Sequence, residues 1–180
     1  MNKEILLKEN EAFCILPWIH MHVWPNGNAM PCCIADSRQP FGNLKDNTIE
    51  EVWNSEKYKE LRKSMLRGKK LDVCKRCYEL EGSTNIWTLR KNHNEWFGDK
   101  HFDLVEKTEE DGSIPEMRMA YLDIRFSNIC NMKCRTCGPD LSSQHAKEHK
   151  DMYGEEELIK FLKNDGKIVV NVAHENNFWE

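Results

Sequence analysis

The chain has 180 residues, 39% of them hydrophobic, and a formal net charge of −4. This length allows one or two small domains with a modest core. A sequence pI near 6.0 does not indicate the basic domain that would be expected of a nucleic-acid-binding protein. No stretch approaches the ~18 consecutive apolar residues of a membrane span, and the Ile5-Leu6-Leu7 run is too short for a secretory core. We therefore expect a cytoplasmic protein that binds neither nucleic acid nor a membrane.

Cysteine spacing is the main chemical signal. The chain has eight cysteines, and five of them lie in CxxC or CxxxCxxC arrays. In a chain without a signal sequence, such arrays favour metal or cluster ligation over structural disulfides.

The first cysteines flank a predicted β-hairpin. Residues 19–24 alternate apolar residues with histidine, and Pro25-Asn26-Gly27-Asn28 is a strong turn signal. The returning arm ends in Cys32 and Cys33. The hairpin therefore brings these two thiols back beside Cys14.

Helices are predicted next. Thr48 to Glu51 form a predicted capping box, and Ser55 can cap a second helix that stops at Gly68.

Cys74 and Cys77 then form a CxxC at a helix start, where two thiolates point the same way. Four thiolates are the number that a [4Fe-4S] cluster requires, and here they would come from Cys14, one of Cys32 or Cys33, Cys74 and Cys77. The alternative is a structural zinc site, which could also use His20 or His22.

Residues 13–90 resemble the SPASM/twitch auxiliary-cluster module of radical S-adenosylmethionine (radical SAM) enzymes. The matching elements are Cys-x-x-Pro-Trp, the Asn-Gly hairpin ending in Pro-Cys-Cys, Gly42-Asn43-Leu44, Val52-Trp53-Asn54-Ser55, and Cys74-x-x-Cys77-Tyr78 followed by Glu81. The resemblance implies an auxiliary [4Fe-4S] cluster on Cys14, Cys32, Cys74 and Cys77. Cys32 is chosen over Cys33 because it aligns with the module's ligand after the hairpin strand, and strand neighbours point to opposite faces. The four-cysteine form fits a twitch domain, although the module commonly follows the barrel and here precedes it.

A second cysteine motif follows a predicted strand. Leu122, Ile124 and Phe126 alternate with polar residues, which is the period-2 pattern of a strand. The loop after it holds Cys130, Cys134 and Cys137. Three thiolates at this spacing can hold three irons of a [4Fe-4S] cluster and leave the fourth iron open to a ligand. A zinc site is the alternative, but it would lack a local fourth ligand.

This strand and its CxxxCxxC loop resemble the opening of the radical SAM superfamily core, a partial (β/α) barrel. The resemblance implies that S-adenosylmethionine chelates the open iron and is cleaved by one electron to a 5'-deoxyadenosyl radical. It also implies an electron donor such as flavodoxin or ferredoxin and a peptide or protein substrate. Thr136 stands where many members have an aromatic residue near the adenine, so only backbone contacts are expected there. No further catalytic residue is identified.

The expected fold class is α/β: an α+β module of a β-hairpin plus helices, followed by the opening β/α units of the barrel. We expect the auxiliary module at residues 1–95, a linker at 96–117 and an incomplete radical SAM core at 118–180. A further strand is predicted at Lys167–Val172. The chain would then be a fragment with low activity of its own.

Two alternatives complete the predictions. The His145–His149 segment formally matches the HxxEH motif of a zinc-protease group, but its charged flanks favour a solvated helix face. The alternative function is a non-catalytic iron-sulfur or zinc protein for electron transfer or partner binding.

Overall fold

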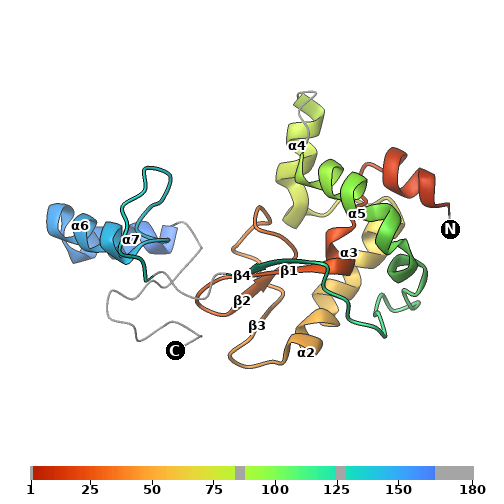
Figure 1. Ribbon diagram of the computed structural model, residues 1–180, viewed down its shortest axis with the longest axis horizontal. Helices are drawn as coiled ribbons and strands as arrows, with labels where there is room; N and C mark the ends of the chain where they lie inside the picture. The colour runs from red at the N-terminus through yellow and green to blue at the C-terminus, as the bar shows by residue number, and fades with distance from the viewer. Residues whose placement is uncertain (1, 84–87, 125–128, 165–180) are drawn as a thin grey trace.

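We describe the protein from a computed structural model that covers residues 2–83, 88–124 and 129–164. Figure 1 shows a larger part that holds the strands and most helices, and a helix pair, α6 and α7, at the opposite end of the molecule. The described elements mix helices with one sheet. The predicted α/β class is therefore confirmed.

The hairpin forms where the turn residues predict it. After a short π-helix, η1 (Ile5–Glu9), and α1 (Leu16–Ile19), the chain enters β1 (His20–Val23) and returns as β2 (Asn28–Met30). The two strands are antiparallel, with His22 opposite Met30. Gly27 has φ +83°, a left-handed conformation that glycine adopts without steric cost.

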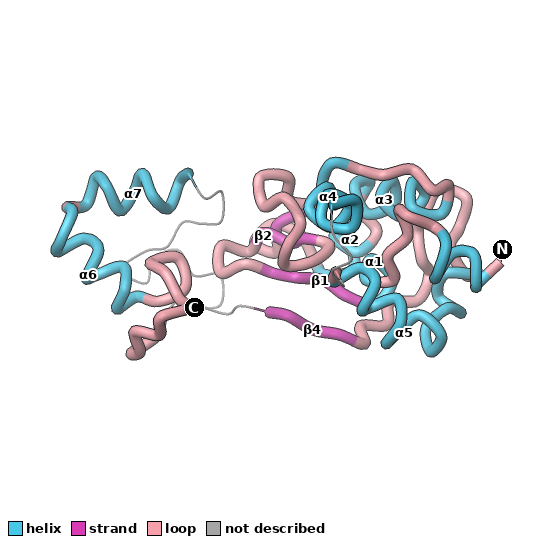
Figure 2. Tube along the Cα trace, turned by 90° about the horizontal axis from the view of Figure 1, so that it is seen from above, coloured by secondary structure: helices cyan, strands magenta, loops and turns pink. Residues whose placement is uncertain are grey.

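The strand that precedes the second cysteine motif joins the same sheet. β4 (Tyr121–Ile124) pairs in parallel with β1, with His20 opposite Tyr121 and His22 opposite Asp123. β3 (Gly42–Asn43) completes the order β3-β2-β1-β4 among the described residues. Figure 2 shows β4 alongside β1. Residues 125–128, which include the predicted strand position Phe126, lie outside the described residues, and the barrel stays a prediction.

The predicted helices of the first half are present. α2 (Ile49–Trp53) begins with the complete Thr48–Glu51 capping box. α3 (Glu56–Leu66) has Ser55 at its N-cap position, although the Ser55 side chain makes no capping bond. Gly68 follows α3 with φ +71° and ends it. A 3-10 turn, η2 (Asp72–Cys74), then leads into α4 (Lys75–Ser83).

Helix α5 (Leu89–Glu106) is capped by the Thr88 side chain and packs against α1. The boundary expected between residues 95 and 96 falls inside this helix. Between α5 and β4, residues 107–120 contain no helix or strand, and the expected division into domains stays a prediction.

One hydrophobic cluster stabilises the larger part. Its buried members come from the segment before α1 and from α1, β1, α2, α3 and α5, and include Phe13, Trp18, Trp53, Leu61 and Leu104. Arg62 is buried with them, and its guanidinium donates to the Pro17 carbonyl at 3.0 Å. A buried cation with such partners indicates a fixed position of α3 against α1.

The second part has a much smaller core. α6 (Ser143–Tyr153) and α7 (Glu155–Asn164) are joined at Gly154, which has φ +87°. They pack through Ala146, Leu158 and Leu162. No helix in the described parts of the chain combines the length and apolarity needed to cross a membrane. The predicted strand Lys167–Val172 lies outside the described residues.

Candidate metal centres

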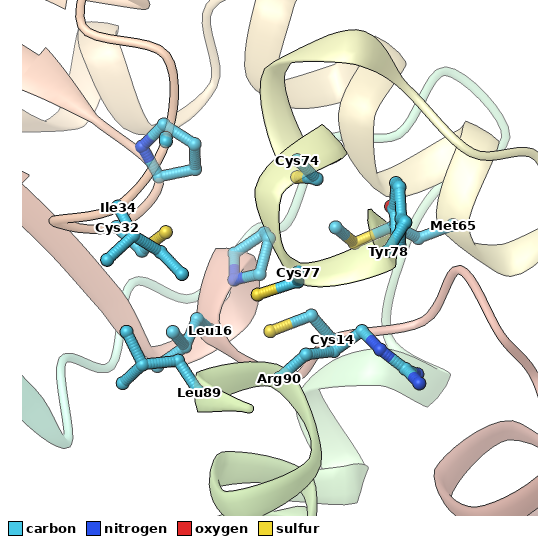
Figure 3. Close-up of a pocket in the computed structure, with 13 residues that line it drawn as sticks. Cys14, Leu16, Cys32, Ile34, Met65, Cys74, Cys77, Tyr78, Leu89 and Arg90 are labelled. Carbon is cyan, nitrogen blue, oxygen red and sulfur yellow. The ribbon is translucent and has the colours of Figure 1, made fainter. Parts of the chain in front are cut away.

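The four cysteines of the first set line one cavity (Figure 3). Cys14 precedes α1, Cys32 follows β2, Cys74 ends η2, and Cys77 lies in the first turn of α4. Figure 3 shows the Cys32 side chain pointing toward Cys14 and Cys77. The fold therefore brings thiols from three separate segments to one place. The walls are mainly apolar and include Leu16, Pro17, Ile34, Met65 and Leu89.

Backbone hydrogen bonds tie the cysteine-bearing segments together. The Cys74 N–H donates to the Leu71 carbonyl at 3.0 Å and closes the turn that presents Cys74. The Asp36 N–H donates to the Val73 carbonyl at 3.1 Å, which joins the loop after Cys32 to the same turn. These bonds place two ligand segments without help from any side chain of the set.

Burial in this cavity raises the pKa of the thiols of Cys14, Cys32, Cys74 and Cys77, and the neighbouring cysteines raise it further for the first three. A thiolate here has little water around it, so iron cations would be the main source of compensating charge. Soft thiolates in an apolar pocket suit an iron-sulfur cluster. The donor set therefore fits such a cluster.

The four thiols do not form a binding site for a single metal ion. In the described ranges of the chain, no three Cys, His, Asp or Glu side chains form a group that could hold one metal ion. The cavity measures about 30 Å³. A cavity of this size holds about one water molecule, so the surrounding side chains would have to move to admit a four-iron cluster.

Cys33 lies apart from the first set. It lines a wider groove of about 790 Å³, together with Trp24, Arg76 on α4 and Asp140. Cys32 and Cys33 follow the end of β2 in a turn in which the Ala35 N–H donates to the Cys32 carbonyl at 3.3 Å, and in this turn Cys32 reaches the small cavity and Cys33 does not.

The second set is far more open. Cys130 and Cys137 are half-buried, and Cys134 is exposed, as is Thr136. The Cys137 N–H donates to the Cys134 carbonyl at 3.0 Å. This turn brings the backbone of Cys134 and Cys137 together.

The start of α6 holds this second loop. The Ser143 hydroxyl accepts from the Cys130 N–H and donates to the Cys130 carbonyl, both at 3.2 Å. The His145 Nε2–H donates to the Cys134 carbonyl at 3.1 Å, and the Ser142 hydroxyl donates to the Met132 carbonyl at 2.8 Å. Sequence reasoning missed these contacts. Their only signal was the polar start of a helix directly after the cysteines.

The two histidines weighed as zinc ligands face β4 instead. The His20 Nδ1–H donates to the Tyr121 carbonyl at 2.8 Å, and His22 Nδ1 lies 3.0 Å from the Asp123 carboxylate. Neither imidazole lines the four-cysteine cavity. Burial lowers the pKa of His20 to about 4, which keeps this imidazole neutral near pH 7.

The HxxEH histidines also have other contacts. His145 binds the cysteine loop, and the His149 ring lies 4.8 Å from the Tyr153 ring. The solvated-helix interpretation of this segment therefore agrees with the structure better than a metal site.

Comparison with known proteins identifies the first region. No curated protein and no solved structure matches the chain. Residues 14–78 match the family model of SPASM, an iron-sulfur cluster-binding domain that is typical of radical SAM proteins. The match begins at Cys14 and includes the whole four-cysteine set. Residues 14–78 of this chain are therefore a SPASM iron-sulfur cluster-binding domain.

Proposed function

We propose that the chain is the iron-sulfur-binding portion of a radical SAM protein with two clusters. The first set of cysteines, on the elements up to α5, would ligate an auxiliary [4Fe-4S] cluster. Cys130, Cys134 and Cys137 would ligate a second [4Fe-4S] cluster with one open iron. Residues from β4 onward would open the radical SAM core.

The observation that supports the auxiliary centre most directly is the shared cavity. Cys14, Cys32, Cys74 and Cys77 line it from three segments, within the residues that match the SPASM domain. For the second centre, support comes from the CxxxCxxC spacing and from the loop that α6 orders after β4.

With S-adenosylmethionine on its open iron, the second cluster would supply the electron that cleaves the sulfonium to methionine and a 5'-deoxyadenosyl radical. The residues of this chain would hold and shield that site. Thr136 is exposed, and its backbone would contact the adenine. A peptide or protein would be the substrate, and flavodoxin or ferredoxin the electron donor.

Metal analysis after anaerobic reconstitution tests the proposal. We expect about eight irons per chain, corresponding to two four-iron clusters. Zinc in place of iron would contradict the proposal and support a structural zinc protein.

Cysteine variants separate the two centres. The triple variant Cys130→Ala, Cys134→Ala, Cys137→Ala should keep about half of the iron, because the auxiliary set is intact. Cys32→Ala should lose the auxiliary cluster. Cys33→Ala is the matched control, since Cys33 lines a different groove, and it should retain all of the iron. Equal losses in the Cys32 and Cys33 variants would refute this ligand assignment.

Cofactor cleavage tests the enzymatic part of the proposal. The reconstituted chain is incubated with S-adenosylmethionine and dithionite, and 5'-deoxyadenosine is quantified. We expect product that disappears in Cys134→Ala. A chain that holds both clusters but gives no product above the Cys134→Ala background would leave an electron-transfer role in its place.

A further inference from the structure

We propose that Arg90 and Asn94, one turn apart on α5, are positioning residues of the auxiliary centre. They fix the backbone on both sides of Cys14, and the ion pair between Arg90 and Glu81 sets the charge beside the cluster. This inference rests on the proposed auxiliary cluster. It also extends the cluster-binding unit beyond the matched residues 14–78 into α5.

Arg90 connects the two helices that frame the cavity to the Cys14 segment. It is 6% exposed and lines the cysteine cavity. Its Nη1 donates to the Asn10 carbonyl at 2.9 Å and to the Phe13 carbonyl at 3.0 Å. Its Nε lies 3.0 Å from both carboxylate oxygens of Glu81, and its Nη2 also donates to Glu81. Because Glu81 is on α4, one guanidinium links the Cys77 helix to the residue before Cys14.

Asn94 holds the other side of Cys14. It is 4% exposed, and its Oδ1 accepts from the Ile15 N–H at 2.8 Å. Its Nδ2 donates to the Phe13 carbonyl at 3.0 Å. The residues before and after Cys14 are thus bound by one amide, and both are fully buried. Water cannot readily replace these bonds, so a buried donor or acceptor left unpaired would cost about 1–3 kcal/mol.

Neither contact is needed to hold α5 itself. The helix already has an N-cap in Thr88 and a packing surface against α1. Arg90 and Asn94 lie on adjacent turns of α5, and both side chains bind the buried loop around Cys14. We therefore infer that their hydrogen bonds stabilise this loop rather than the helix. Because that loop contains Cys14, these contacts restrict the position of the Cys14 thiol.

The ion pair between Arg90 and Glu81 predicts the direction in which each variant shifts the reduction equilibrium of the cluster. The side chains of Arg90 and Glu81 are 8% and 10% exposed, so their charges are weakly screened. Together they nearly cancel. Removing the cation would leave a buried carboxylate near the cluster and disfavour its reduction, whereas removing the carboxylate would leave the cation and favour reduction.

The positioning role is tested first by amide hydrogen exchange in the cluster-free chain. Asn94→Ala should speed exchange of the Ile15 amide by about tenfold, because its acceptor is lost. Glu95→Ala, at the exposed neighbouring position, is the control and should leave this rate unchanged. Equal Ile15 exchange rates in the two variants would refute the positioning role, whether or not the protein binds a cluster.

The charge role is tested by potentiometry in the triple-alanine background of Cys130, Cys134 and Cys137, which isolates the auxiliary cluster. Arg90→Gln should shift the reduction equilibrium toward the oxidised form by on the order of tenfold, or about 59 mV for a one-electron couple. Glu81→Gln should shift it in the opposite direction, and the double variant should return close to the parent value. Lys91→Gln, which removes an exposed cation one residue away, should have little effect.

Opposite shifts of the reduction equilibrium in Arg90→Gln and Glu81→Gln would indicate an effect of charge. A simple loss of structure would shift the equilibrium of both variants in the same direction. If Arg90→Gln takes up no auxiliary iron while Lys91→Gln does, the positioning role is supported and Glu81→Gln still tests the sign. Shifts of the same sign, or none in either variant, would overturn the charge role. A parent protein without a cluster at Cys14, Cys32, Cys74 and Cys77 would instead refute the proposed function.

Discussion

The two cysteine sets lie in opposite surroundings. Around the first set, residues from α1 to α5 form one large hydrophobic cluster, which includes Cys14 and against which Cys32 and Cys74 pack. Around the second set, Cys134 is exposed, and the helices that follow share three buried apolar residues in the described part of the chain, Ala146, Leu158 and Leu162. Both loops contain cysteines at cluster-binding spacing, yet only the first is built into a core.

The difference shows two ways of placing a set of cysteines. In the first region, apolar burial and buried hydrogen bonds from Arg90 and Asn94 hold the backbone around Cys14. In the second, side chains at the start of α6 hold the loop at its backbone only. A region with so small a core gains little from burial, so metal binding or contact with more chain would have to supply its order.

The largest expected effect tests whether the first region depends on its core. Trp53 is fully buried, and its ring lies 5.0 Å from the Arg62 guanidinium. Trp53→Ala should lower the free energy of unfolding by about 3–5 kcal/mol, because it leaves a large cavity. Chemical denaturation measures this change.

Trp96→Ala is the matched control, since Trp96 on α5 is 57% exposed. It should change the free energy of unfolding by less than about 0.5 kcal/mol. Similar losses in the two variants would show that the cluster around α2 and α3 does not carry the stability of this region.

The next prediction concerns β1 and β4, which link the two regions. The pKa of His20 is about 4 in the fold, below the ordinary value of 6.5, because the imidazole is buried against Tyr121. The unfolded chain therefore takes up the proton first as the pH falls. Stability should fall from about pH 6.5 and level off near pH 4, by at most about 3 kcal/mol.

His20→Asn keeps a donor for the Tyr121 carbonyl but does not titrate. Denaturation curves between pH 4 and pH 7 should lose most of this His20-dependent slope in the variant. An unchanged slope would mean that other groups cause the acid sensitivity.

Local sequence signals predicted much of this fold. Asn26-Gly27 marked the hairpin, the Thr48–Glu51 pair marked the start of α2, and Gly68 marked the end of α3. Each of these depends on contacts within a few residues, so the sequence pattern contains the whole cause. The convergence of Cys14 with Cys74 and Cys77 was also expected, but through resemblance to a known module rather than through local rules.

What the sequence could not predict depends on distant partners. The pairing of β4 with β1 and the bond between Asn94 and Ile15 join segments that are about 80 to 100 residues apart. A strand pattern shows which faces are apolar, but not which neighbour it pairs with. Likewise, the sequence does not distinguish Arg90 from a solvent-exposed arginine on a helix. Its burial beside Glu81 is visible only in the structure.

A smaller effect compares two glycines with similar backbone angles. Gly112, in the first region, has φ +90°, and a Cβ there would lie 2.8 Å from the Lys59 carbonyl carbon. Gly154, between α6 and α7, has φ +87° with nothing within 4 Å. Both alanine variants would have a strained backbone, costing about 1–2 kcal/mol, but only Gly112→Ala adds a clash with main chain.

Thermal unfolding should therefore show a larger loss for Gly112→Ala than for Gly154→Ala. Because helices α6 and α7 contribute little to the main core, Gly154→Ala should leave the main transition almost unchanged. A main transition lowered equally by both would indicate that the two regions unfold as one unit.

The smallest expected effect tests how weakly the second loop is held. Ser143→Ala removes the hydroxyl that bonds both the N–H and the carbonyl of Cys130. A typical hydrogen bond contributes about 0.5–1.5 kcal/mol, so opening of the loop should become several-fold easier while global stability changes little. Amide exchange at Cys130 measures this opening. Ser83→Ala, which loses only exposed bonds to the Glu79 and Leu80 carbonyls at the end of α4, is the control and should not affect Cys130. If Ser143→Ala left Cys130 exchange unchanged, the start of α6 would not be what orders the loop. If it lowered the main unfolding transition as well, the loop would share in the core of the first region, and the contrast between the two cysteine sets would fail.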